Sequence, residues 1–239
     1  IQNIDIYNNT WQNLYGATPA GPPRGLYIST TLNSLTLRNN TFARCPNVDN
    51  RIMVFDSNEI IIEDCIFIEN NFQKNRWGGI GMTFDRTNFK VIFRNCVFRD
   101  NEGIVGGAIQ FGGPISPNPN SGSIELYSCR FEGNKASDTG GALSFTSKGN
   151  NIVQDCIFND NTAGKNGGAV SIIPVQESGD YEYAGEDSSI NSIINCQFNS
   201  NTSPTGHSLF IMNKGKSIVE GCTFVNEKAE SNGGMLSCQ

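Results

Sequence analysis

Cysteine is the residue type whose number and spacing in this chain could best support chemistry, because thiolates bind metal ions and thiols form disulfides. Six of the eight cysteines open the phrase Cys-x-Phe-x-x-Asn, the last copy having Glu in place of Asn: Cys65, Cys96, Cys129, Cys156, Cys196 and Cys222. His207 is the only histidine and no Cys-x-x-Cys spacing occurs, so the sequence predicts no metal site. We expect no cofactor either.

Carboxylates could perform acid–base chemistry or bind calcium if several of them shared one strand face. No such column of Asp is found, and one set of outward positions carries unlike residues: Gln110, Ser144, Ser171, Phe210 and Ser237. His207 stands where other copies have Gly, which favours a corner residue over a catalytic base. We therefore predict no catalytic residues.

The loop at residues 173–189 has the residue types best suited to contact calcium or a glycan. It joins carboxylates to aromatic side chains, among them Asp180, Tyr181, Glu182 and Tyr183. Loops on a rigid scaffold are common sites of specificity. A solvated acidic loop without a ligand is the alternative. Residues 14–25 and 112–123 form two further loops rich in Pro or Gly.

The elements that must hold these residues follow from the repeat. The six cysteines are separated by 31, 33, 27, 40 and 26 residues, and two earlier copies place Asn9 and Asn40 in the Cys position. Apolar residues alternate along the chain up to three positions before each Cys. After this three-residue spacing, alternation resumes from the Cys to the aromatic residue, which indicates two short strands joined by a bend. Gly-Gly phrases lead into a third strand, which ends at Phe111, Phe145 and Ile172 and, in weaker copies, at Phe55, Phe84, Ile211 and Cys238. The prediction is an all-β, right-handed parallel β-helix of about eight coils with three strands each.

Stacking the coils in register predicts three inward columns. Cysteine forms the first, which we interpret as small buried apolar residues. Disulfides between coils are the second interpretation, although parallel Cβ vectors leave neighbouring Cβ atoms too far apart without distortion. The aromatic column consists of Trp11, Phe42, Phe67, Phe98, Phe131, Phe158, Phe198 and Phe224.

The third column is an asparagine ladder at the next turn: Asn70, Asn101, Asn134, Asn161 and Asn201. Asparagine tolerates left-handed backbone, bonds to neighbouring amides and stacks on itself. Cys45 and Leu14 stand in this position in the second and first coils, so the ladder should fail there. The Gly-Gly pairs should supply positive φ or close packing at a corner rather than a phosphate site.

Composition excludes two classes of partner. The net charge of −6 argues against nucleic acid, which needs a basic stripe, and against an anionic membrane surface. No apolar run is long enough to insert this segment into a membrane. We treat residues 1–239 as a single β-helix segment, and its ends predict either adjoining segments of a longer chain or end-to-end self-association.

The repeats resemble those of the polymorphic membrane protein family, named for chlamydial surface proteins. Phe98 to Asn101 with Gly106 to Ile109 matches its Phe-x-x-Asn and Gly-Gly-Ala-Ile motifs, as do Phe131 to Asn134 with Gly140 to Leu143, and Phe158 to Asn161 with Gly167 to Val170. The resemblance implies a right-handed β-helix at a cell surface or outside the cell, with adhesive or structural roles and no catalytic residues. The first two coils depart from it, because they lack Cys at the first position of the phrase and a clear Gly-Gly pair.

Three glycosylation sequons occur, at Asn8, Asn39 and Asn201. Asn8 and Asn39 should share an exposed corner and could carry glycans in a secreted eukaryotic protein, whereas Asn201 should be buried. The sequence thus predicts a non-enzymatic extracellular or cell-surface scaffold or filament subunit, with glycans or other surface proteins as partners. The alternative is a carbohydrate-active β-helix enzyme.

Overall fold

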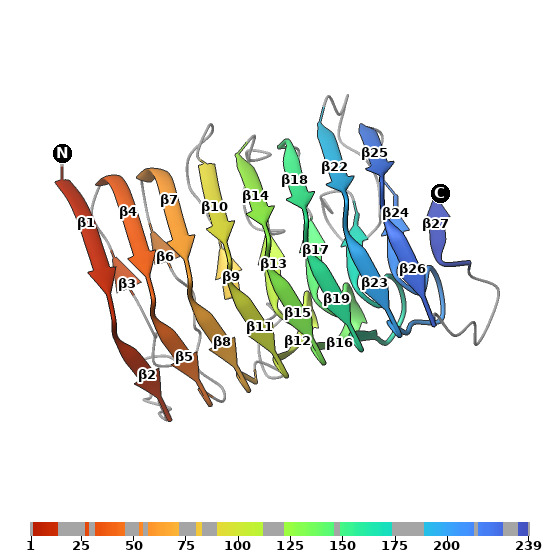
Figure 1. Ribbon diagram of the computed structural model, residues 1–239, viewed down its shortest axis with the longest axis horizontal. Helices are drawn as coiled ribbons and strands as arrows, with labels where there is room; N and C mark the ends of the chain where they lie inside the picture. The colour runs from red at the N-terminus through yellow and green to blue at the C-terminus, as the bar shows by residue number, and fades with distance from the viewer. Residues whose placement is uncertain are drawn as a thin grey trace, which may run out of the picture.

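Every element that the structure describes is a β-strand (Figure 1). The computed structural model describes residues 2–13, 27–28, 32–45, 53–54, 57–71, 80–82, 90–111, 122–145, 149–173, 189–212, 215–226 and 234–238. Strands from successive repeats lie side by side from the N-terminal to the C-terminal end, so each repeat is one coil of a solenoid.

Two eight-stranded sheets run the length of the stack, and every pairing between neighbours is parallel. The first sheet contains β1 (Gln2–Tyr7), β4 (Leu32–Arg38), β7 (Ser57–Glu63), β10 (Lys90–Arg94), β14 (Ser123–Tyr127), β18 (Asn151–Gln154), β22 (Ile190–Ile194) and β25 (Lys216–Glu220). The second contains β2 (Thr10–Gln12), β5 (Thr41–Ala43), β8 (Ile66–Ile68), β11 (Val97–Arg99), β15 (Arg130–Glu132), β19 (Ile157–Asn159), β23 (Gln197–Asn199) and β26 (Thr223–Val225). The parallel β-helix of eight coils is therefore confirmed.

The third predicted strand forms a six-stranded sheet and a separate pair. The sheet contains β9 (Ile80–Met82), β13 (Ile109–Phe111), β17 (Leu143–Phe145), β21 (Val170–Ile172), β24 (Leu209–Ile211) and β27 (Leu236–Cys238), and the pair joins β3 (Tyr27–Ile28) to β6 (Met53–Val54). In the register of this sheet Phe111 pairs with Met82. The predicted strand ends at Phe84 and Phe55 lie outside the described residues.

A fourth short strand was not predicted. It forms a three-stranded sheet of β12 (Glu102–Val105), β16 (Lys135–Thr139) and β20 (Thr162–Ala163), directly after the asparagine ladder. These segments carry few large apolar residues and therefore lack the alternation that marks the other strands. Three strands per coil is thus an undercount for the three coils that contain β12, β16 and β20.

The aromatic column fills the centre of the stack. Its rings lie parallel within 11°, with centroids 4.6 Å apart for Trp11 and Phe42 and 4.8–4.9 Å apart for the other neighbours. Phe98, Phe131, Phe158 and Phe198 are fully buried. Parallel pairing of the strands sets one ring directly over the next, so one continuous aromatic stack runs through a core that also contains Leu, Ile, Val and Cys side chains.

The corners between the first and second sheets, and after the second sheet, share one construction. A residue in left-handed backbone stands immediately before each inward Cys or Asn, as Asp64 (φ 54°) does before Cys65 and Asp100 (φ 53°) before Asn101. The sequence had suggested left-handed backbone at the ladder asparagine itself. The structure places it one residue earlier. Asp, Asn, Ser and Gly fill most of these positions because they accept positive φ most readily.

Candidate functional site

The cysteine column lies inside the coil rather than in a site open to ligands. Cys65, Cys96, Cys129, Cys156 and Cys196 are fully buried, and only the end member Cys222 is half-exposed. All eight cysteines of the chain are free thiols, so the structure holds no disulfide between coils.

The thiols hydrogen-bond to the backbone across the corner, which their interpretation as apolar residues missed. The Sγ atom of Cys65 accepts from the backbone N–H of Asn40 at 3.4 Å, and the Cys65 thiol approaches the carbonyl oxygens of Glu63 and Leu37 at 3.3 and 3.6 Å. The side chain of Asn40 has the same role in the preceding coil, accepting from the N–H of Asn9 at 3.0 Å and donating to the carbonyl of Ile6 at 2.8 Å. Asn and Cys are therefore interchangeable in this position because each both accepts and donates.

Burial keeps the central thiols protonated. It raises the pKa of Cys96 and of Cys129 well above the ordinary value of 9.0, with hydrogen bonding to the next thiol along the column as the second cause. A protonated buried thiol is neither a good nucleophile nor a metal ligand. These central thiols are therefore structural.

The asparagine ladder is confirmed in detail. The side-chain N–H of Asn134 donates to the Oδ1 of Asn161 at 3.0 Å and to the carbonyl of Phe98 at 3.0 Å. In return its Oδ1 accepts from the backbone and side-chain N–H groups of Asn101 at 3.1 and 2.9 Å. Cys45 takes the equivalent position in the second coil, where its N–H donates to the Oδ1 of Asn70. These amides are saturated by their neighbours and have no free group for a ligand.

The two glycines of a Gly-Gly corner are needed for different reasons, the first for its backbone conformation and the second for the close approach of the next coil. The first glycine has positive φ, as at Gly167 (62°), and the second faces the next coil so closely that a Cβ on Gly168 would overlap the backbone of Thr202 and the carbonyl of His207. His207 occupies the second position one coil later and is 1% exposed. This histidine is therefore enclosed at a corner, as its place in the repeat predicts, and faces no open groove.

Four of the outward residues of the six-stranded sheet are enclosed rather than open to a ligand. The side chains of Gln110, Ser144, Ser171 and Phe210 are at most 4% exposed. A substrate-binding face needs side chains that a polymer can reach, and these four positions do not offer one.

An open cleft lies instead over the N-terminal coils, on the outer side of the first sheet. It has a volume of about 710 Å³, and we call it the N-terminal cleft. Its lining residues come from three successive coils: Asp5, Ile6, Tyr7, Asn8, Thr36, Arg38, Asn39 and Asp64. Alternation along β1 and β4 turns Asp5, Tyr7, Thr36 and Arg38 outward while Ile6 and Leu37 face the core.

Sequence reasoning selected only Asn8 and Asn39 among the residues of this cleft. Both lie at the exposed corner after the first sheet, with φ of 60° and 53°, and the side-chain N–H of Asn39 donates to the Oδ1 of Asn8 at 2.8 Å. Asn201, in the third sequon, is fully buried. The signal that could have pointed to the cleft was Tyr7, an exposed aromatic residue two positions before Asn9.

Several predicted contacts fall outside the described residues. Asp180, Tyr181, Glu182 and Tyr183 lie there, as do the loop residues 14–25 and 112–121. Within the described ranges, no three His, Cys, Asp or Glu side chains gather closely enough to hold a metal ion. The same ranges contain no helix long and apolar enough to cross a membrane.

Comparison with known proteins agrees with the geometry. A family model described as a right-handed β-helix region matches residues 1–115. A model of the chlamydial polymorphic membrane protein repeat matches residues 128–146 and 155–172, which contain two of the Phe-x-x-Asn and Gly-Gly-Ala phrases. No curated protein and no solved structure matches the chain significantly. The chain is therefore a right-handed parallel β-helix. Its central coils are similar to polymorphic membrane protein repeats, a repeat family of surface-associated proteins.

Proposed function

We propose that this protein is a non-enzymatic scaffold displayed outside a cell, with an adhesive or structural role. One observation carries the proposal: the residues that recur from coil to coil lie in the core and at the corners. Inside the stack these thiols, rings and amides are buried, which leaves the outward rows, the loops and the end faces for recognition. The matched repeat family supports the surface location.

Surface display is tested by treating intact source cells with a protease that cannot enter them. Antibodies raised against the 239-residue chain should stain unpermeabilised cells, and the protease should abolish that staining while leaving a cytoplasmic marker intact. Staining that requires permeabilisation would overturn the surface assignment.

The lack of enzymatic activity is tested separately. Uronate-containing and neutral polysaccharides are incubated with the purified chain, with and without calcium, and new reducing ends and unsaturated products are measured. We expect none above a heat-denatured control. Sustained cleavage would establish instead the alternative of a carbohydrate-active β-helix enzyme.

We further propose that the end faces of the stack pair with another coil, either from adjoining segments of a longer chain or from a second copy. The support is the exposure of apolar residues on the last described coil, where Met235 is 50% exposed and Leu236 42%. Leu209, the register partner of Leu236, is fully buried. Electron microscopy of the isolated chain at rising concentration should show rods that lengthen in whole multiples, and single short rods at every concentration would exclude the second copy.

A further inference from the structure

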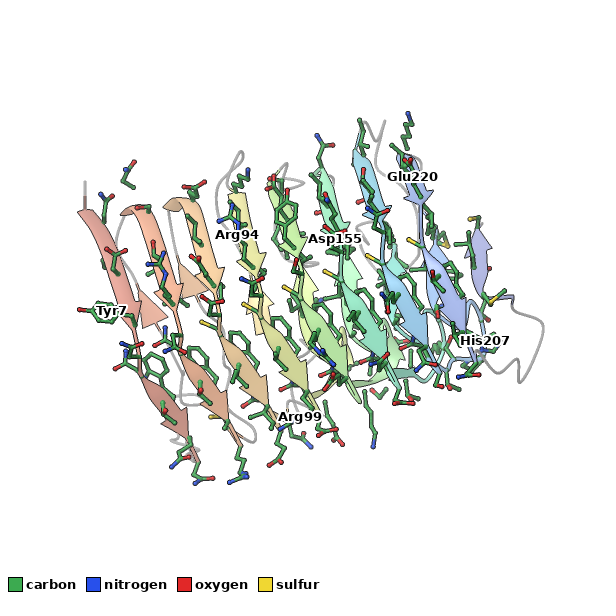
Figure 2. All side chains as sticks on the ribbon, in the orientation of Figure 1. Tyr7, Arg94, Arg99, Asp155, His207 and Glu220 are labelled. Atoms are coloured by element: carbon green, nitrogen blue, oxygen red, sulfur yellow. The ribbon has the colours of Figure 1, made fainter. Side chains whose placement is uncertain are left out.

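The N-terminal cleft presents an exposed aromatic side chain whose hydroxyl group bonds to no other described residue. Tyr7 is 63% exposed, and Figure 2 shows its ring projecting from β1 at the N-terminal end of the stack. Tyr127 occupies the same outward row four coils later, but it donates its hydroxyl to Glu125 at 3.1 Å. No described residue bonds to the Tyr7 hydroxyl. A free, exposed tyrosine ring offers an apolar face for a ligand that is apolar on one side and polar at its edge.

Polar groups with unused bonding capacity surround this ring. Asp5 and Thr36 lie directly opposite each other in the register of β1 and β4, and neither side chain bonds to another described residue. The Asn39 to Asn8 bond leaves a side-chain donor on Asn8 and the acceptor of Asn39. The cleft therefore offers both donors and acceptors to a ligand. A ligand rich in hydroxyl groups matches this pattern because every hydroxyl both donates and accepts.

The charge around the cleft selects among hydroxyl-rich ligands. Asp5 and Asp64 line it, and Glu63 at its edge pairs with Arg38 at 3.1 Å, so the one guanidinium is already neutralised by a carboxylate. Anionic ligands such as uronate or sulfated glycans would meet uncompensated negative charge. Neutral sugars meet no such penalty.

The dimensions of the cleft also fit a chain of sugars. The cleft crosses three coils, and the same coils repeat every 4.6 to 4.9 Å in the aromatic column of the second sheet. This repeat is close to the length of one pyranose unit along a glycan chain, so successive coils can present equivalent groups to successive sugars. The volume of about 710 Å³ accommodates a short oligosaccharide rather than a monosaccharide alone.

We propose that the N-terminal cleft binds a neutral oligosaccharide, with one sugar stacked on Tyr7 and its hydroxyl groups bonded by Asp5, Thr36 and Asn8. The proposal deepens the proposed adhesive function, on which it rests for access to glycans outside the cell. It assigns to the first sheet the glycan contact that the sequence had suggested for the loop at residues 173–189.

Binding is measured by calorimetric titration of the 239-residue chain, produced in bacteria so that Asn8 and Asn39 carry no glycan. The probes are unsubstituted hexasaccharides of glucose, mannose, xylose and N-acetylglucosamine, with a uronate hexasaccharide for comparison. We expect at least one neutral probe to bind and the uronate to bind more weakly. Failure of every neutral probe to bind would overturn the proposal while leaving surface display, measured on cells, untouched.

Variants locate the binding site. Tyr7→Ala should weaken the affinity about ten-fold through loss of stacking, and Tyr7→Trp should retain it. Tyr127→Ala is the matched control from the same row and should change nothing. Asp5→Asn should weaken neutral binding and reduce the discrimination against uronate. Thermal melting monitored by circular dichroism verifies that each variant is folded. Unchanged binding in folded Tyr7→Ala would show that the glycan occupies another surface.

Discussion

At the scale of single residues, each ladder asparagine satisfies backbone groups that water cannot reach. Asn134 is fully buried and bonds to two coils at once, through Asn101 on one side and Asn161 on the other. Its amide supplies a donor and an acceptor in a plane, which no apolar side chain of similar size can do. The ladder therefore stabilises the corner and fixes the register of one coil on the next.

Replacing this residue should test that role. Asn134→Leu leaves the N–H of Asn101 and the carbonyl of Phe98 buried without partners, so we expect a loss of about 3 kcal/mol or more in the free energy of unfolding. Asn134→Cys should lose less, because thiols fill the equivalent position at Cys45 and bond to backbone N–H groups in the cysteine column.

Urea unfolding followed by circular dichroism provides the measurement for the Asn134 variants. The control is Asn159→Ala, an outward position on the neighbouring coil, which should stay within about 0.5 kcal/mol of the parent protein. Equal effects of Asn134→Leu and Asn159→Ala would contradict a stabilising ladder.

At the scale of elements, the Gly-Gly corner depends on how closely neighbouring coils approach. Gly168 lies against the backbone of Thr202, whereas Gly234 holds the same position on the last described coil with only the carbonyl of Leu236 near its Cβ direction, at 3.6 Å. The two glycines differ in how crowded their surroundings are and not in backbone conformation, because neither has positive φ.

The pair Gly168→Ala and Gly234→Ala turns this contrast into a prediction. The added methyl at residue 168 must push two coils apart, so we expect a cost of about 1–3 kcal/mol and a lower melting temperature. The same methyl at residue 234 should be nearly neutral. Differential scanning calorimetry of both variants measures the difference, and equal melting temperatures would disprove the crowding argument.

Elements that bury an alternating face could be predicted from the sequence, and the others could not. The first two strands of each coil follow from apolar positions such as Phe93 and Phe98, which are periodic and fully buried. β16 escaped because Lys135–Thr139 buries only two side chains. The N-terminal cleft escaped as well, because Tyr7, Arg38 and Asp64 are far apart in sequence and resemble ordinary surface residues until stacking brings them together.

At the scale of the whole molecule, the centre of the cysteine column links stability to pH. The folded state holds the pKa of Cys96 and Cys129 above 9.0, the ordinary value for a thiol that unfolding exposes. The unfolded chain therefore binds fewer protons than the folded chain above pH 9, and stability falls as the pH rises there. Below pH 9 the contribution of these thiols is fully present.

We accordingly expect the free energy of unfolding to decrease by about 1.4 kcal/mol per pH unit for each such thiol above pH 9. Urea unfolding between about pH 7.5 and 10.5, in a reducing buffer, measures the slope. A double variant, Cys96→Ala with Cys129→Ala, removes two titrating groups and should flatten it. A slope identical to that of the parent protein would show that other groups cause the pH dependence.

The direction of the hydrogen bonds gives the molecule a definite mechanical character. Strands run across the stack, so the backbone bonds between coils, such as those joining β10 to β14, run along its axis. A tensile load on the two ends therefore pulls on one junction between coils at a time instead of shearing whole sheets. Each junction that opens releases one repeat, between 26 and 40 residues of slack for the coils that carry the cysteine phrase. A stack of this kind lengthens in steps and dissipates the work of a sudden pull coil by coil.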